Sequence, residues 1–446
     1  MTDTIYAPAT APGRAAVAII RISGPGAASS LERISGAALP RARHAVVRHL
    51  ISADGELIDQ ALVLWLPGPA SFTGEDCVEL HTHGGFAVLE AVTAELASLG
   101  LRSAEPGEFS RRAFANGKLD LLQAEAVADL VDAQTTAQRR QALSQMAGDI
   151  GRRFETWRAR LLEALALIEA ENDFPDEDLP GSLAELARPA LSAVEEDLQS
   201  ALASAARGRA IRSGFRVALI GAPNAGKSSL LNALARRDVA IVSQHAGTTR
   251  DIIETELVLD GYSVIVADTA GLRHAEDEVE QQGVDRAQRW AAQADLRVLL
   301  VAPDVPQSNC ARDLVRPGDL VVFSKADLRS GLHSEDQSWA EDAGLEPVLA
   351  SGATELGVVE LLSKLRDKVV GALDADEPAF ATRARHEEAL RSALAGVSRA
   401  QTVLSSGPER AAEDIRQAAK ALQSVIGVVD REAVLDRVFS SFCIGK

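Results

Sequence analysis

Cysteine is scarce in this chain of 446 residues, and the three cysteines, Cys77, Cys310 and Cys443, lie far apart. Their spacing matches neither a metal-ligand pattern nor a disulfide framework, which argues against zinc-ribbon and disulfide-stapled proteins. His81 and His83 stand at strand spacing without a third ligand, so a structural role is favoured over a metal site. A reducing cytoplasm is the simplest environment for such a chain.

Long apolar runs and an excess of basic charge are also missing. No hydrophobic run approaches the roughly 18 residues of a membrane span, so none is expected. The N-terminal sequence Met-Thr-Asp-Thr-Ile-Tyr-Ala-Pro lacks the basic and then apolar segments of an export signal. The net charge of −18 argues against a general nucleic-acid coat, although RNA stays open as a substrate.

The first part of the chain, residues 1–118, has the pattern of an α/β domain. Apolar runs of strand length occupy 16–22 and 60–66, between glycine and proline signals. A helical pattern follows over 86–99, and Gly100 ends it. At 446 residues the chain is long enough for two or three domains of this kind, each with its own core.

Helix-forming residues dominate from 119 to 211, with apolar side chains at helical spacing. An acidic loop is predicted over 173–180, and the helical pattern resumes from 373 to 446. The economical interpretation is one helical domain, formed by 119–211 and 373–446, into which residues 212–372 are inserted. Both ends of the inserted domain would then connect to helices.

The inserted stretch alternates strands and helices, which predicts βαβ units and a mostly parallel sheet. Its strand-like runs are 215–220, 262–267, 296–301, 320–323 and 347–350. We therefore expect a multidomain α/β plus α fold, with an N-terminal α/β domain, a helical domain and an inserted α/β domain.

The first inserted strand leads into Gly221-Ala-Pro-Asn-Ala-Gly-Lys-Ser228, which fits the G-x-x-x-x-G-K-[ST] phosphate-binding loop. In such a loop, backbone N–H groups and a helix N-terminus, here that of 228–235, surround the phosphate oxygens. Lys227 is expected to reach the β- and γ-phosphates, and Ser228 to place its hydroxyl on Mg²⁺.

Two later segments fall where a GTPase requires its switches. The stretch 247–251 can act as the first switch, with Thr249 touching Mg²⁺ and the γ-phosphate. Asp268 follows a strand and can act as the Walker-B acid, with the Gly271 amide sensing the γ-phosphate.

A third segment, Ser-Lys-Ala-Asp at 324–327, resembles the Asn-Lys-x-Asp signature that reads guanine. Asp327 would accept hydrogen bonds from the guanine N1–H and exocyclic amine, which adenine does not offer, so guanine is favoured. Ser324 replaces the usual Asn, which shortens or removes one contact near the base and predicts weaker nucleotide affinity. Ser351 begins a fifth segment expected at the nucleotide, and its match to the GTPase pattern is weaker than that of the other four.

The position that holds a water-orienting Gln in Ras-type enzymes is Leu272, which cannot hold a water. Catalysis must therefore find its polar group and its positive charge elsewhere. Glu280, in the acidic segment 276–280, is one candidate; a solvated surface acid is the alternative.

These motifs, with their insertion into a helical domain, resemble those of the MnmE (TrmE) family of tRNA modification GTPases over essentially the whole chain. The C-terminal Phe-Cys-Ile-Gly-Lys at 442–446 is highly specific to that family. N-terminal segments similar to the family's are 21–24, 71–76, 83–85, 107–114 and 116–126.

The resemblance implies an inserted P-loop (Ras-like) GTPase domain that dimerises across a bound K⁺, which takes the place of an arginine finger. Asn224 matches the family's K⁺ ligand, and Ser243, His245 and Thr248 match a loop that completes the ion's shell. Glu280 matches the catalytic glutamate, and Arg273 a dimer or switch contact. The residues expected at the nucleotide are Asn224, Ala225, Gly226, Lys227, Ser228, Ser229, Ser243, Gln244, His245, Ala246, Gly247, Thr248, Thr249, Asp268, Thr269, Ala270, Gly271, Lys325, Asp327 and Ser351.

The resemblance also implies that the N-terminal domain mediates dimerisation and binds 5-formyl- or methylene-tetrahydrofolate, the source of a one-carbon unit. Arg21, Glu79, Lys118 and Lys446 match its ligand-contacting positions. A pterin offers donors to a carboxylate, and the folate tail offers carboxylates to Arg or Lys. Cys443 lies beside these positions in the pattern, and its role, chemical or structural, stays open.

In the family, a homodimer works with an FAD-containing partner, MnmG (GidA), in a heterotetramer that uses NADH and modifies C5 of the wobble uridine of certain tRNAs. One alternative is a regulatory GTPase for ribosome assembly; the folate positions and the C-terminal motif argue against it. A folate enzyme with GTP as a structural ligand is disfavoured by the two switches and Glu280. The sequence does not identify the tRNAs or the nitrogen donor, ammonia or glycine.

Overall fold

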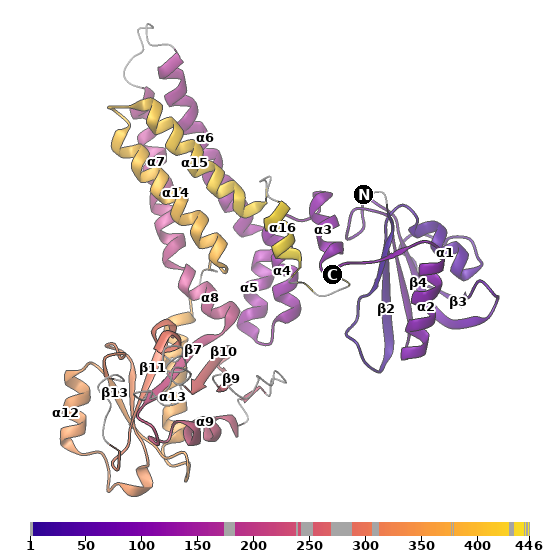
Figure 1. The fold of residues 1–446 in the computed structure, drawn as a ribbon. Coiled ribbons are helices and arrows are strands. Elements are labelled where there is room, and N and C mark those ends of the chain that lie inside the picture. Colours follow the sequence, from indigo (N-terminus) through magenta and orange to yellow (C-terminus); the bar gives the residue numbers. More distant parts are fainter. Residues whose placement is uncertain are drawn as a thin grey trace, which may run out of the picture. The chain divides into compact units, whose positions relative to one another are not determined.

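A computed structural model describes two compact units of the chain (Figure 1). Unit 1 comprises Met1–Asp132, Ala142–Glu195 and Ser392–Lys446, and unit 2 comprises Ala133–Gln141 and Glu196–Arg391. The described residues are 3–173, 183–237, 240–241, 253–268, 288–305, 312–375, 377, 379–427, 432–440, 442 and 445. Apart from Asp173, the predicted acidic loop at 173–180 lies outside them.

Unit 1 contains a six-stranded sheet in the order β3-β4-β5-β2-β1-β6. Its strands are β1 (Ile5–Pro8), β2 (Ala15–Ser23), β3 (Val46–Ile51), β4 (Leu57–Leu66), β5 (Cys77–Gly84) and β6 (Arg102–Ser103). Neighbouring strands are antiparallel except β1 and β6. The apolar runs at 16–22 and 60–66 correspond to β2 and β4, whereas β3 and β5 mix polar and apolar side chains and give no clear strand signal.

Two helices, α1 (Ala27–Ser35) and α2 (Phe86–Ser98), pack on one face of this sheet. Their apolar side chains join those of the strands in one core, which includes Ile20, Ile22, Leu31, Ile34, Val78, Leu80, Val92 and Leu96. Side chains alternate along a strand, so Ile19 and Arg21 of β2 point to the opposite face. Arg21 and Glu79, two of the charged residues predicted to bind folate, therefore lie away from this core.

Outside this sheet and its two helices, the described regular elements of unit 1 are helices. Its helices are α3 (Glu108–Ala115), α4 (Leu121–Asp132), α6 (Asp149–Asp173), α15 (Pro408–Ile426) and α16 (Glu432–Phe439). α6 and α15 pack side by side, and Arg416 pairs with Glu169 at 2.7 Å between them. Near its end the chain returns to the N-terminal sheet, since a Cβ on Gly445 would lie 2.2 Å from the carbonyl oxygen of Pro8.

Unit 2 contains a seven-stranded sheet in the order β13-β12-β11-β7-β10-β9-β8. Its strands are β7 (Phe215–Gly221), β8 (Ala240–Ile241), β9 (Ile253–Leu259), β10 (Tyr262–Asp268), β11 (Leu296–Val301), β12 (Leu320–Phe323) and β13 (Glu346–Leu349). The pairs from β13 to β10 are parallel, and β9 and β8 add an antiparallel edge. The prediction of a mostly parallel sheet is confirmed.

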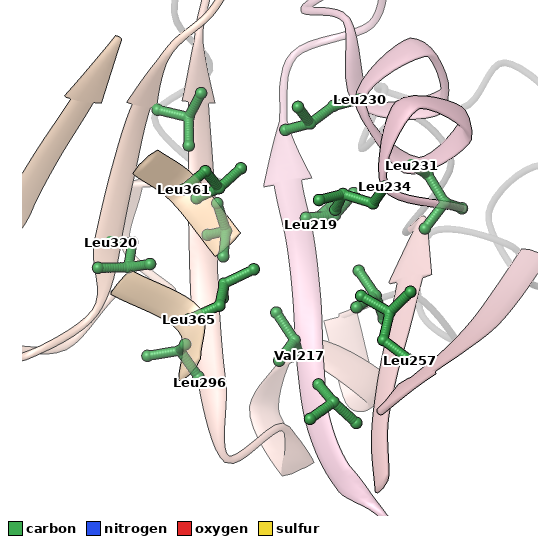
Figure 2. Packing of buried hydrophobic residues seen from close by; sticks show 14 of the residues in the cluster. Val217, Leu219, Leu230, Leu231, Leu234, Leu257, Leu296, Leu320, Leu361 and Leu365 are labelled. Carbon is green, nitrogen blue, oxygen red and sulfur yellow. The ribbon is translucent and has the colours of Figure 1, made fainter. Parts of the chain in front are cut away.

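Helices cover both faces of this sheet; they include α8 (Ala205–Ser213), α9 (Lys227–Ala235), α12 (Ser334–Asp342) and α13 (Val358–Leu373). Figure 2 shows leucines of α9 and α13 lying against Val217 and Leu219 of β7. Ala218 and Ile220 of the same strand join a second core with Ala340 of α12. Because β7 is buried on both faces, it is apolar at nearly every position, which explains its clear sequence signal.

Three helices, α5 (Thr136–Met146), α7 (Leu183–Ala203) and α14 (Ala384–Val403), each contribute residues to both units. Unit 2 thus includes helical residues that the sequence assigns to the helical domain. The domain boundaries at 118, 211 and 372 stay a prediction. Along the described ranges, no helix is long and apolar enough to cross a membrane.

Candidate functional site

The phosphate loop follows β7, the strand between β11 and β10 at the middle of the parallel sheet. Gly221 has φ +150°, and an added Cβ would lie 2.7 Å from the carbonyl oxygen of Leu300. Asn224 adopts a left-handed conformation, with φ 61°, and Gly226 at the N-terminus of α9 has φ 94°. The loop therefore requires glycine at 221 for space and favours it at 226 for backbone conformation.

Lys227, the first residue of α9, is folded back under this loop. Its Nζ donates to the carbonyl oxygens of Gly221 and Ala222, both at 3.0 Å, and the side chain is buried. Burial lowers the pKa of Lys227, and the charge of Asp268 partly opposes that change. The ammonium is thus held inside the loop, within reach of phosphates bound there.

Ser228 and Asp268 meet at the end of β10. The Ser228 hydroxyl donates to Oδ2 of Asp268, whose side chain is almost fully buried. Oδ1 of Asp268 has no hydrogen-bond partner among the residues that the structure describes. A buried carboxylate oxygen is costly unless a donor or a cation satisfies it. A hydroxyl beside a carboxylate is also a donor set that suits Mg²⁺, which takes one or two protein ligands together with phosphate oxygens.

A cavity of about 180 Å³ lies beside the phosphate loop. Asp327, in a short 3-10 turn η1 (Ala326–Leu328), stands on its wall and is exposed. The Lys325 ammonium pairs with the carboxylate of Asp304, at 2.6 and 2.8 Å. The lining residues are Gly226, Ser229, Leu230, Val322, Ser324, Lys325, Asp327, Leu328, Ala350, Ser351, Gly352 and Ala353.

Ser324, which stands where the guanine-reading signature has Asn, is hydrogen-bonded to the phosphate loop. Its hydroxyl lies 2.6 Å from the carbonyl oxygen of Ala225 and donates to it. Ser351 accepts hydrogen bonds from the backbone of Ala353 and Thr354, both at 3.3 Å, and shapes the next loop. The cavity thus joins the phosphate loop to the two loops predicted to hold the base.

The structure brings together the predicted nucleotide-site residues that it describes, namely Asn224, Ala225, Gly226, Lys227, Ser228, Ser229, Asp268, Lys325, Asp327 and Ser351. Others lie outside the described residues: Ser243, Gln244, His245, Ala246, Gly247, Thr248, Thr249, Thr269, Ala270, Gly271, Leu272, Arg273 and Glu280. The positions predicted to hold phosphate, Mg²⁺ and base therefore have described geometry, and the predicted K⁺ loop and catalytic glutamate do not.

In unit 1, Arg21 and Glu79 face each other across β2 and β5, in register. Nε and Nη2 of Arg21 donate to Oε1 of Glu79 at 3.1 and 2.9 Å. The guanidinium also lies over the rings of Phe72 and Phe109, with centroid distances of 5.2 and 5.8 Å. Stacking and pairing hold the arginine in one orientation, as a binding site for a planar charged ligand requires.

Lys118 approaches the same loop from another segment. Gly74 lies two positions after Phe72 in this loop. A Cβ added to Gly74 would lie 3.2 Å from Cγ of Lys118. Cys443 and Lys446 lie outside the described residues, but Gly445 contacts Pro8, next to the Ala7 that pairs with Arg21. The predicted folate positions that are described therefore converge on one end of the sheet.

Nearby histidines have structural contacts. Nε2 of His81 is 3.5 Å from Oε2 of Glu79, and Nδ1 of His83 is 2.7 Å from Oδ1 of Asp59. Burial alone would raise the pKa of Asp59. Hydrogen bonds from His83 have the larger combined effect, so the pKa of Asp59 lies below its ordinary value. No group of three His, Cys, Asp or Glu residues that could hold a metal ion occurs in the described part of the chain.

Arg112 is a residue to which the sequence analysis assigns no role. It is fully buried, and its guanidinium pairs with Asp3 at 2.9 Å and with Glu75 and Glu108 at 3.0 Å. Glu75 also accepts a hydrogen bond from Ser23 at 2.8 Å. The network thus fixes the loop 71–76, which carries Phe72. In the sequence, this network is indicated only by charged residues in two segments that carry the family resemblance. These segments are 71–76 and 107–114.

Comparisons with known proteins identify the family of this chain. A family model for the MnmE helical domain matches residues 121–443, and one for the GTP-binding protein TrmE N-terminus matches residues 4–118. Proteins named tRNA modification GTPase MnmE are 51% identical in Phenylobacterium zucineum and Caulobacter vibrioides and 47% identical in Parvibaculum lavamentivorans. Each comparison covers 100% of this chain and 100% of the relative. The chain belongs to the MnmE family of tRNA modification GTPases.

Proposed function

We propose that this chain is a potassium-dependent GTPase that acts in the cytoplasm with the FAD-containing partner MnmG and modifies C5 of the wobble uridine of certain tRNAs. A tetrahydrofolate supplies the one-carbon unit, and NADH reduces the partner's flavin. The observation that carries the GTPase part is the hydrogen bond from the exposed Ser228 hydroxyl to the buried Asp268, whose Oδ1 has no partner among the described residues.

In this proposal the phosphate loop binds GTP through its backbone N–H groups and the N-terminus of α9. The Lys227 ammonium leaves the carbonyls of Gly221 and Ala222 for the β- and γ-phosphates, and Asp327 accepts the guanine N1–H and amine. Ser228 and Asp268 would hold Mg²⁺, which neutralises charge that develops on the phosphate oxygens. The residues thus orient the γ-phosphate for attack by water.

The potassium site is proposed from the family resemblance and from Asn224. This residue is exposed in the phosphate loop, so a cation can reach its side chain. Ser243, His245 and Thr248 are proposed to complete the shell, and Glu280 to orient the water. A monovalent cation there would supply the positive charge that an arginine finger supplies in Ras-type enzymes.

The folate site is proposed at Arg21, Glu79, Lys118 and Lys446. Both described donors of Arg21 go to Oε1 of Glu79, so Oε2 is the oxygen that can turn to the amine of a pterin. Arg21 and Lys118 supply positive charge for the carboxylates of a folate tail. The rings of Phe72 and Phe109 provide apolar surface at the same place.

The homodimer is proposed to form through the sheet face opposite α1 and α2. Strand register places Val47, Leu62, His81 and Ile19 in one row across four strands of this face. Val47 is 56% and Leu62 38% exposed, and Val17 on β2 is 51% exposed. Exposed apolar side chains that gather on one sheet face are typical of an interaction surface.

The test of the whole proposal is nucleoside mass spectrometry of tRNA from cells that lack this chain. Modified C5 groups on wobble uridines should disappear and should return with the parent gene. The GTPase part has a separate test, since replacing K⁺ by Na⁺ should strongly lower hydrolysis while nucleotide binding stays nearly intact. Equal rates in both salts would sink the cation mechanism, and unchanged wobble uridines would sink the assignment to tRNA modification.

A further inference from the structure

The cavity of about 180 Å³ beside the phosphate loop is called the base cavity below. It is lined by a hydroxyl, that of Ser324, whose proton is already used in a hydrogen bond within the protein. Ser324 is 4% exposed, and its backbone N–H donates to the carbonyl oxygen of Val301 at 2.9 Å. Its Oγ lies 2.6 Å from the carbonyl oxygen of Ala225. A carbonyl oxygen carries no proton, so the hydroxyl is the donor, and a serine hydroxyl has one proton to give. That proton is committed to the phosphate loop.

Because its proton is used in this way, the Ser324 hydroxyl cannot donate a hydrogen bond to a base in the cavity. The hydroxyl retains only its lone pairs, and the N7 and O6 atoms of guanine are acceptors too. Two acceptors that face each other make no hydrogen bond. An asparagine at this position has two amide hydrogens. It could satisfy Ala225 with one of them and a base acceptor with the other.

Three other donors of the described cavity lining, which belong to Lys325, Ser351 and Ala353, are also engaged within the protein. The Lys325 ammonium pairs with Asp304 at 2.6 and 2.8 Å. The backbone N–H of Ser351 donates to Leu356 at 2.9 Å, and that of Ala353 to the Ser351 hydroxyl at 3.3 Å. The carboxylate of Asp327 remains as an acceptor for the N1–H and the C2 amine.

We infer that Ser324 is a positioning residue that ties the base cavity to the phosphate loop, and that N7 of the guanine is left unread. The inference rests on the proposed GTP binding and deepens it by naming the atoms of the base that are recognised. Guanine nucleotides altered at N7 should therefore bind as well as the natural ones, whereas those altered at N1 or C2 should not.

The test is calorimetric binding of GDP, 7-deaza-GDP, IDP and ADP to the full-length chain. GDP and 7-deaza-GDP should bind with dissociation constants within about twofold of each other, whereas IDP, which lacks the amine, should bind about tenfold more weakly. ADP should bind more weakly still, because it leaves Asp327 without its donors.

Variants separate positioning from base reading. Ser324→Ala should weaken GDP and 7-deaza-GDP by the same factor, about fivefold, because the phosphate loop loses its tie while N7 gains no donor. Ser324→Asn should create a preference for GDP over 7-deaza-GDP of about fivefold. Ser338→Ala, an exposed serine on α12, is the matched control and should change neither affinity.

Each contrary outcome has one meaning. A fivefold preference of the parent chain for GDP over 7-deaza-GDP would overturn the inference while leaving guanine binding in place. A changed ratio in Ser324→Ala, or an unchanged ratio in Ser324→Asn, would also overturn it. Equal affinity for GDP and ADP would overturn the guanine part of the proposed function, and the inference with it.

Discussion

The nucleotide site and the Arg21–Glu79 site are built in different ways. Eight consecutive residues, 221–228, form the phosphate loop of unit 2, and mostly backbone groups face the ligand. The site in unit 1 consists of side chains from separate segments, since Arg21 and Glu79 are 58 positions apart and meet only because β2 and β5 pair in register. A backbone site is therefore local and robust, whereas a side-chain site depends on the packing that holds its strands and loops.

The largest effect that tests this contrast is expected from Asp268→Asn. The neutral amide replaces a buried carboxylate that pairs with Ser228, so GTP hydrolysis should fall about 1000-fold at saturating Mg²⁺. Single-turnover kinetics measure it. Binding of 5-formyl-tetrahydrofolate to the same variant should stay at the parent level, because the change is confined to unit 2.

The control for that experiment is Asp342→Asn, which removes an exposed carboxylate from the last position of α12. It should hydrolyse GTP at the parent rate. If Asp268→Asn also keeps that rate, the hydrogen bond between Ser228 and Asp268 is structural, and the assignment of a Mg²⁺ ligand is wrong.

Arg112→Ala tests the dependence of the unit 1 site on packing. Removing the buried guanidinium takes one buried ion pair from Glu75 and one from Glu108, which should destabilise unit 1 by about 3 kcal/mol. Hydrogen exchange of β2 and β5 measures the loss. Folate binding should fall with it, while hydrolysis in unit 2 survives.

Its neighbour Arg111 provides a matched control. Arg111 pairs with Asp436 at 3.1 Å, and the aspartate is 59% exposed. Arg111→Ala should therefore cost less than about 1 kcal/mol. Equal losses for the two variants would show that burial of the Arg112 network contributes nothing.

Glu79→Gln is a smaller change at the ligand itself. The amide has no negative charge to pair with Arg21 and only one acceptor oxygen, so binding of 5-formyl-tetrahydrofolate should weaken about tenfold. Fluorescence or calorimetric titration measures this. Glu90→Gln, on the exposed side of α2, should bind as the parent does. If both variants bind equally, Glu79 does not contact the ligand.

The same contrast explains how much of the molecule the sequence predicts. β7 is buried on both faces, and the residues after it fit a continuous pattern, so strand, loop and helix are all predicted correctly. β3 and β5 carry mixed side chains, and Arg112 acquires its role only when residues from three separate segments meet. Strand register and long-range ion pairs depend on tertiary packing, which a local pattern does not contain.

Ser324 lies between these two cases. Its sequence position indicates a lost contact near the base, which follows from comparing serine with asparagine. The pattern cannot show where the hydroxyl goes instead, because its acceptor on Ala225 is 99 positions away. The motif predicts which residues meet the ligand, and the structure shows how the shortened side chain is used.

The smallest expected effect concerns Lys227, the charged side chain within the backbone site. Burial lowers its pKa below the ordinary 10.5, so the unfolded chain binds more protons than the folded chain between the two values. Stability should therefore rise with pH in that window as the buried ammonium loses its proton. The affinity for GDP should fall by about threefold over the same window, because the phosphates lose their cation. Titrations of binding and of unfolding from neutral to alkaline pH should move in opposite directions, whereas Lys227→Arg should remove both trends. Parallel trends in the parent would mean that the ammonium does not contact the phosphates.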